Sequence, residues 1–146
     1  MSGPAGGPLD VDALNGNLGT GFTKVLGLHF TAASADEVRA EWTLRPELMQ
    51  PYGITHGGVH CAVVETVAST AGAIWLGDRG QVVGVNNSTD FLRASREGTL
   101  TAVATPIHRG RLQQLWQVHI TDSDDRLLAR GQVRLQNIVD ADRMGH

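Results

Sequence analysis

The chain has little cysteine: Cys61 is the single one among 146 residues, so no disulfide can form within the chain. Disulfides persist in oxidising compartments and are rare in the cytosol, where thiols are kept reduced. A lone thiol therefore fits a reducing compartment. From it we predict a cytoplasmic protein.

Long apolar runs are also missing. No apolar run approaches the ~20 residues that a helix needs to cross a bilayer. The first ten residues, MSGPAGGPLD, contain neither the basic region nor the apolar region of a signal peptide. We therefore expect no membrane partner.

Positive charge is not in excess. Lysine and arginine number 12 against 15 acidic residues, which gives a formal net charge of −3. The whole molecule therefore has no field that would attract nucleic acid, and we expect no nucleic-acid partner. An anionic ligand would have to be held by a local group of arginines.

What is present is the composition of an ordinary globular protein, with 41% apolar and 18% charged residues. The length suits one domain with a sizeable core. Glycine and proline are concentrated near the start, and polar residues at the end. We divide the chain into a flexible N-terminal segment (1–20), a folded domain (21–138) and a polar tail (139–146).

The apolar periodicity predicts one long central helix, from about Gly58 to Leu76, that is too apolar for a surface position. Short helical turns are expected within 11–26 and two strands within 28–44. Four further strand-like stretches follow the helix, separated by turn signals, and we expect them to form an antiparallel meander: 82–92, 99–108, 113–121 and 127–138. The prediction is an α+β fold in which a curved antiparallel sheet wraps around the helix.

Glu65 is the anomaly of that helix. It lies in the stretch QPYGITHGGVHCAVVETVAS (50–69), where its neighbours are small and apolar. We expect it to be mostly buried, and burying a carboxylate is costly unless it has a partner or a function. Desolvation would also raise the pKa of the carboxyl group toward the range useful for base catalysis.

Two glycines open the helix, Gly57 and Gly58. The first N–H groups of a helix have no partner within it, and they lie at the positive end of its dipole. Glycine also allows a ligand to approach the backbone closely. These N–H groups can polarise a carbonyl and bind the oxyanion that develops when it is attacked.

Other polar residues surround these two features. His56 precedes the helix, Gln50 lies in the loop before it, and Ser69 follows Glu65 by one turn on the same face. His60 follows His56 by four residues. A metal site is not favoured, because HGGVH lacks the glutamate of the HExxH motif.

The combination of Gln50, His56-Gly57-Gly58, Glu65 and Ser69 resembles the hotdog-fold thioesterase superfamily. Within it, the chain is most similar to a branch that contains the Arthrobacter-type 4-hydroxybenzoyl-CoA, phenylacetate-pathway and 1,4-dihydroxy-2-naphthoyl-CoA thioesterases. The resemblance spans residues 20–138. Phenylacetate-type members carry Asp at the position of Glu65, so Glu favours the other two groups; Ser69 departs from the Thr of the hydroxybenzoyl enzyme.

This resemblance implies a hotdog fold of about six strands for residues 21–138. It also implies an acyl-CoA thioesterase that releases a free acid, here an aryl acid, and CoA. Glu65 would act as nucleophile or as general base, two roles that the sequence leaves open, and Gly57 would be the oxyanion site. Gln50 would position the carbonyl or the water. No cofactor is implied beyond the CoA of the substrate.

The family further implies homodimers joined edge to edge, often paired into tetramers, with active sites at the dimer interface. Its later strands line the CoA groove, and Gly58 would lie beside the ligand. Arginine forks suit the phosphates of CoA, and four arginines stand near predicted strand ends: Arg93, Arg96, Arg109 and Arg111. We expect them to act as a cluster.

Three other interpretations compete. A hotdog dehydratase or hydratase pairs a catalytic histidine with an acid in a sequence context that is not found here. A non-catalytic acyl-CoA binding module would use Glu65 only structurally. A structural dimerisation domain would leave the His-Gly-Gly turn and Gln50 unexplained.

Overall fold

The computed structural model describes residues 7–139. Two helices, α1 (Val11–Leu18) and α2 (Gly21–Leu26), precede the first two strands, and a single long helix occupies the middle of the chain. The other elements, in chain order, are β1 (His29–Ala33), β2 (Val38–Thr43), the 3-10 turn η1 (Pro46–Leu48), α3 (Gly57–Leu76), the 3-10 turn η2 (Gly77–Arg79), β3 (Gln81–Phe91), β4 (Thr99–Arg109), β5 (Gln113–Thr121) and β6 (Leu127–Ile138).

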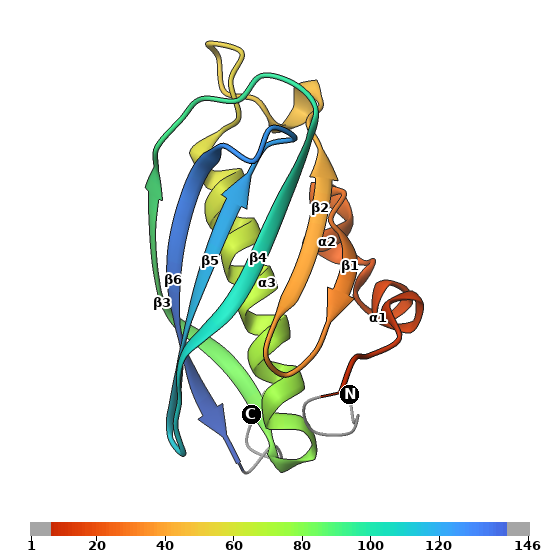
Figure 1. Cartoon of the computed structure of the whole chain (residues 1–146), viewed down its shortest axis with the longest axis vertical. Coiled ribbons are helices and arrows are strands. Elements are labelled where there is room, and N and C mark those ends of the chain that lie inside the picture. The colour runs from red at the N-terminus through yellow and green to blue at the C-terminus, as the bar shows by residue number, and fades with distance from the viewer. Residues whose placement is uncertain (1–6, 140–146) are drawn as a thin grey trace.

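The strands form one antiparallel sheet of six, in the order β1-β2-β4-β5-β6-β3. The sheet curves around α3, which runs along its concave side (Figure 1). The predicted α+β architecture is therefore confirmed: a curved antiparallel sheet of six strands around one central helix.

The predicted four-strand meander is wrong at its first strand. β4, β5 and β6 follow one another as hairpins, but β3 pairs with β6 and lies at the edge of the sheet, while β2 pairs with β4. Fully buried residues of β4, such as Leu100 and Ala102, continue the apolar face of Ala40 and Trp42 in β2. The alternating pattern predicts which segments are strands, but it does not determine their neighbours.

The core lies between α3 and the sheet. Val63, Val64, Val67 and Ala68 of α3 are fully buried against the inner faces of the strands. Small residues let the helix approach closely: a Cβ at Gly72 would collide with the sheet.

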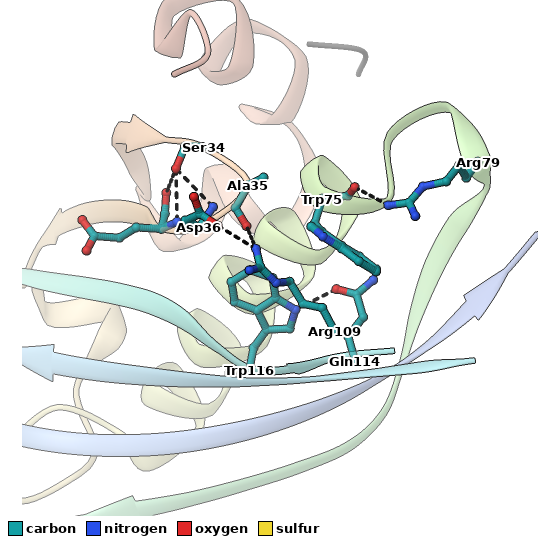
Figure 2. A network of polar contacts seen from close by, with 9 residues as sticks. Ser34, Ala35, Asp36, Trp75, Arg79, Arg109, Gln114 and Trp116 are labelled. Carbon is teal, nitrogen blue, oxygen red and sulfur yellow. Dashed lines mark hydrogen bonds and ion pairs between the residues drawn. The ribbon is translucent and has the colours of Figure 1, made fainter. Parts of the chain in front are cut away.

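A buried polar network joins the second half of α3 to β5 and β6. Gln114 is fully buried and donates to the Gly72 carbonyl and to Asn137 Oδ1, at 3.3 and 2.7 Å. Its Oε1 accepts the indole N–H of Trp116 at 2.7 Å (Figure 2). These bonds satisfy polar groups that the apolar core would otherwise leave unpaired.

The N-terminal segment, expected to be flexible, contains an ordered helix. Asp10 caps α1 by accepting from Asp12 N–H at 2.9 Å, and Leu14 is buried. The Asn15 side chain both donates to and accepts from the backbone of Phe30, at 2.9 and 2.7 Å. Residues 1–6, and all of the expected polar tail except its first residue, lie outside the described residues.

By length and composition alone, residues 57–79 would be apolar enough to cross a membrane, so the expectation that no stretch approaches that length was too strict. More than half of the most apolar window of this stretch is buried. The core helix of a globular domain passes the same test, which makes the finding weak support for a membrane span.

Candidate functional site

His56 caps the start of α3. Its backbone is extended, and its Nδ1 accepts the Gly58 N–H at 2.8 Å. The Val59 N–H is bonded to the His56 carbonyl at 2.9 Å. Within residues 7–139, no atom accepts from the Gly57 N–H. Of the two glycines predicted to meet a ligand, Gly57 therefore offers a free donor, whereas the N–H of Gly58 is already used by the cap.

A cavity of about 360 Å³ lies beside this helix start. Three predicted site residues line it: Gln50, Gly57 and Arg93. A free N–H in the wall of such a cavity, at the positive end of a helix, can bind a carbonyl or anionic oxygen.

Gln50 belongs to a tight loop over the cavity. Its backbone N–H donates to the Ile54 carbonyl at 2.8 Å, and its carbonyl accepts from Gly53 at 2.9 Å. Its side-chain oxygen accepts from the Tyr52 N–H, so the side-chain NH₂ is the group left to meet a ligand. Arg96 braces the same loop by donating to the Tyr52 and Gly53 carbonyls, at 3.3 and 3.4 Å.

Sequence reasoning missed several residues of this cavity. Thr55 and Ser95 are buried and joined by a hydroxyl–hydroxyl bond of 2.7 Å and by a backbone bond of 2.9 Å. Phe91 ends β3 and lies against Gly57, where an added Cβ would come within 2.8 Å of its ring. No local pattern indicates that the end of β3 returns to the start of α3, so the sequence carried no signal for them.

His60 is another wall residue whose place in the cavity was not foreseen. It is 3% exposed, its Nδ1 has no hydrogen-bond partner among the described residues, and its ring lies 6.1 Å from that of Phe91. Burial lowers the pKa of the imidazole to about 4. Sequence reasoning considered His60 only as a metal ligand; in residues 7–139, no three His, Cys, Asp or Glu side chains come together as a metal site would require.

The expected burial of Glu65 is wrong for the single chain, in which its side chain is exposed. The flanking valines Val64 and Val67 face the sheet, whereas Glu65 lies on the flank of α3 beside the edge strand β3. There it is next to Gly84: a Cβ at Gly84 would lie 3.7 Å from the carboxyl carbon. Because Gly84 has no side chain, it leaves the carboxylate uncovered at this point of the strand.

Glu65 is also distant from the helix start of its own chain. Two turns of helix separate it from Gly57, or ~12 Å along the axis, and Ser69 is a further ~6 Å away. Neither residue lines the cavity. The fold therefore brings Gln50 and Gly57 together, but it does not bring Glu65 and Ser69 to the same place within one chain.

The strand β3 runs along α3 and contacts both of these separated places on the helix. Gly84 lies beside Glu65, and Phe91 lies beside Gly57. β3 is an edge strand, and its exposed residues include Val83 and Val85, at 42% and 52% exposure. The free edge of the sheet thus carries exposed apolar side chains and lies next to the predicted catalytic residues.

The four arginines do not form the predicted cluster. Arg93 and Arg96 flank the Gly57 cavity, whereas Arg109 and Arg111 lie at the β4–β5 hairpin, beyond the far end of a strand ~36 Å long. Arg111 lines a second, more open cavity of about 570 Å³. Turn positions can be located in sequence, but which end of the sheet each turn occupies depends on the topology.

Arg109 is already engaged. Its Nη1 donates to the Ala35 carbonyl and to Asp36 Oδ1, both at 2.8 Å, and its guanidinium lies 5.9 Å from the centre of the Trp75 ring (Figure 2). Arg79 approaches the same ring at 4.4 Å. Arg109 thus joins the β1–β2 turn to α3, which argues against its predicted contact with CoA.

The sequence matches the family model described as "Thioesterase superfamily" over residues 52–129. The Mycobacterium tuberculosis protein Rv1847 is 52% identical over 125 residues, which cover 84% of this chain and 89% of that protein. Its solved structure superposes with a TM-score of 0.79 and covers 81% of this chain and 96% of that one.

Two further similarities have functional names. The crystal structure of thioesterase HI1161 from Haemophilus influenzae is 33% identical, with a TM-score of 0.88 and coverage of 94% of this chain and 96% of that one. The 1,4-dihydroxy-2-naphthoyl-CoA hydrolase of Escherichia coli is 29% identical over 119 residues, 82% of this chain and 88% of that protein.

Proposed function

The chain belongs to the thioesterase superfamily and is a hydrolase of its hotdog fold, and from this we propose that it hydrolyses an aryl acyl-CoA to a free acid and CoA. The observation that carries the proposal is the free Gly57 N–H in a cavity wall at the start of α3. Such a donor stabilises the oxyanion of an attacked thioester, and one good donor contributes about 10²–10³ in rate.

We propose that Glu65 reaches this oxyanion site from a second copy of the chain. Two β3 edges that pair antiparallel, centred near Ser88, lay the Gly84 end of one strand beside the Phe91 end of the other. Because Glu65 lies at Gly84 and Gly57 lies at Phe91, the carboxylate then faces the partner's Gly57. This pairing removes the ~12 Å separation that exists within one chain.

The same pairing covers an edge that is otherwise unprotected. An exposed sheet edge can pair with another chain, because its backbone N–H and C=O groups are unpaired. Val83 and Val85 add exposed apolar area to the β3 edge. A two-fold symmetric dimer uses the same surface of both copies and produces two equivalent sites. The proposal therefore includes a homodimer, which assembles into a homotetramer as in the resembled family.

The proposed reaction needs no cofactor beyond the CoA of the substrate. Glu65 either attacks the thioester carbon to form an anhydride, which water then hydrolyses, or takes a proton from the attacking water. The Gly57 N–H holds the developing oxyanion, and the Gln50 NH₂ orients the carbonyl or the water. The C–S bond breaks, and the thiolate of CoA takes up the released proton.

Arg93 is the arginine that best suits the CoA phosphates. It is exposed at the cavity that holds Gly57, and Arg96 lies next to it on the same loop. Guanidinium groups bind phosphate oxygens through paired hydrogen bonds. The lone cysteine and the modest charge fit a cytoplasmic enzyme, which we include in the proposal.

The test is thiol release from a panel of aryl- and alkyl-CoA thioesters, with wild type, Glu65→Gln and Glu65→Ala side by side. Fast aryl-CoA turnover that falls at least ~10²-fold in both variants, with the fold intact by circular dichroism, supports the proposal. Absence of turnover on every thioester, with acyl-CoA binding that is unchanged by Glu65→Ala, would instead support a non-catalytic binding module.

A further inference from the structure

His60 stands out among the described residues that line the Gly57 cavity. It is 3% exposed, and its Nδ1 has no hydrogen-bond partner. Buried polar groups in native proteins are nearly always paired, so an unpaired imidazole in a cavity wall points to a group that arrives with the ligand. The mechanism above makes no use of this side chain.

The position of His60 indicates which part of the ligand it meets. It follows Gly57 by three residues on α3, so the two lie on the same face of the helix, ~4.5 Å apart along its axis. Arg93 lines the same cavity but is exposed, whereas His60 is buried. If the carbonyl binds at Gly57 and the solvated CoA takes the exposed end at Arg93, the buried end at His60 is left for the acyl group.

We propose that His60 is a specificity-determining residue that hydrogen-bonds a hydroxyl group on the acyl part of the substrate. This inference depends on the proposed thioesterase function, because it takes the carbonyl position from that function. It adds the requirement that the acyl group carries a hydroxyl on the side that faces α3.

The chemistry of the wall fits a hydroxyl group better than a charged one. Burial lowers the pKa of His60 to about 4, so the ring is neutral at neutral pH and provides one donor and one acceptor. A hydroxyl can use either. The neighbouring Phe91 ring, 6.1 Å away and tilted by 31°, and Ile54 give the wall an apolar part. An apolar acyl group that carries one hydroxyl suits both features.

The experiment compares kcat/KM for benzoyl-CoA with that for 2-, 3- and 4-hydroxybenzoyl-CoA. Wild type should prefer at least one hydroxylated isomer by about tenfold or more, since a site built around a polar group discriminates against the analogue that lacks it. His60→Phe, which keeps the ring shape, should lower kcat/KM for that isomer by about 10- to 100-fold and leave benzoyl-CoA near the wild-type value. His60→Gln should restore part of the preference.

His29→Phe is the matched control, because His29 is exposed on β1 at the opposite edge of the sheet from β3. This variant should leave unchanged the ratio of kcat/KM for each hydroxybenzoyl-CoA to kcat/KM for benzoyl-CoA. Equal wild-type activity on all four thioesters would overturn the role of His60, and this comparison needs no variant to fold. An equal loss on benzoyl- and hydroxybenzoyl-CoA in His60→Phe would overturn it as well.

A binding measurement separates this inference from the proposed function. Phenacyl-CoA and its three hydroxyphenacyl analogues are thioethers that cannot be hydrolysed, and their affinities are measured by calorimetry. If no thioester is hydrolysed, the thioesterase proposal fails, and these affinities decide on His60 alone. Tighter binding of a hydroxylated analogue that is lost in His60→Phe supports its role. Equal binding, or none, overturns it.

Discussion

Phe91 closes directly over Gly57: a Cβ added to Gly57 would lie 2.8 Å from two carbons of the Phe91 ring. Real Cβ contacts are longer, so a side chain at this position must displace the ring. The ring belongs to the edge strand and lines the same cavity as the free Gly57 N–H. The glycine thus keeps the proposed oxyanion site open, in addition to allowing a close approach to the ligand.

Gly57→Ala is therefore expected to lower kcat/KM for the best acyl-CoA by about tenfold or more, because the displaced ring enters the space of the acyl group. Steady-state thiol release measures this effect. The double variant Gly57→Ala/Phe91→Ala should recover part of the loss, since the ring is gone. Gly16→Ala, where an added Cβ meets nothing within 4 Å, is the matched control and should behave as wild type.

A mixing experiment tests whether Glu65 acts across the dimer. Alone, Glu65→Gln should lose at least ~10²-fold of the activity, and Gly57→Ala about tenfold or more. When the two are unfolded and refolded together, half of the dimers are mixed, and each mixed dimer contains one site with both native residues. Activity should return to roughly a quarter of the wild-type level. If both residues acted within one chain, no mixed dimer would contain an intact site, and activity would not rise above the mean of the two variants measured separately.

The edge strand provides a separate prediction. Val85→Lys places a charge on the exposed edge of β3, where Val85 is 52% exposed in the single chain. The chain should then elute as a monomer in size-exclusion chromatography coupled to light scattering, and thioesterase activity should fall with the dimer fraction. Leu112→Lys, on the β4–β5 turn at 57% exposure, is a matched charge change away from β3. A dimeric and active Val85→Lys would contradict the pairing.

The sequence patterns located the helices and strands, but they did not predict how the strands pair. The bounds of β5 and β6 and the extent of α3 agree with the alternating and helical patterns, because those patterns report which residues face the core. The place of β3 beside β6 was not predictable, since it depends on which strands fit together across the sheet. Long-range pairing of this kind leaves no periodicity.

The site residues also fall into those that the motif predicted and those that only the fold revealed. Gln50 and Gly57 meet because they lie close in sequence, and the motif predicted that. His60, Thr55 and Phe91 became visible as wall residues only through the fold. The expected burial of Glu65 failed because an apolar helix was taken to be covered on all sides, whereas the flank beside Gly84 is open in the single chain.

His60 should make stability depend on pH. Its folded-state pKa, about 4, is depressed below the ordinary value of 6.5, so between these values the unfolded chain binds a proton that the folded chain does not. The free energy of unfolding therefore decreases as pH falls from about 6.5 to 4, by on the order of 3 kcal/mol from this residue. Urea unfolding at several pH values should show a smaller decrease in His60→Gln than in wild type. Identical pH profiles would contradict the assignment.

Arg93 and Arg109 should separate binding from stability. Arg93→Ala is expected to raise KM for acyl-CoA by about tenfold with a small effect on kcat, because a phosphate contact made equally in ground and transition states affects binding alone. The same variant should treat a pantetheine thioester, which lacks the nucleotide phosphates, like wild type. Arg109→Ala should instead lower the free energy of unfolding by about 1 kcal/mol, through loss of its bonds to Ala35 and Asp36, and leave KM unchanged. A raised KM in Arg109→Ala would return this arginine to the CoA site, by way of a neighbouring chain in the oligomer.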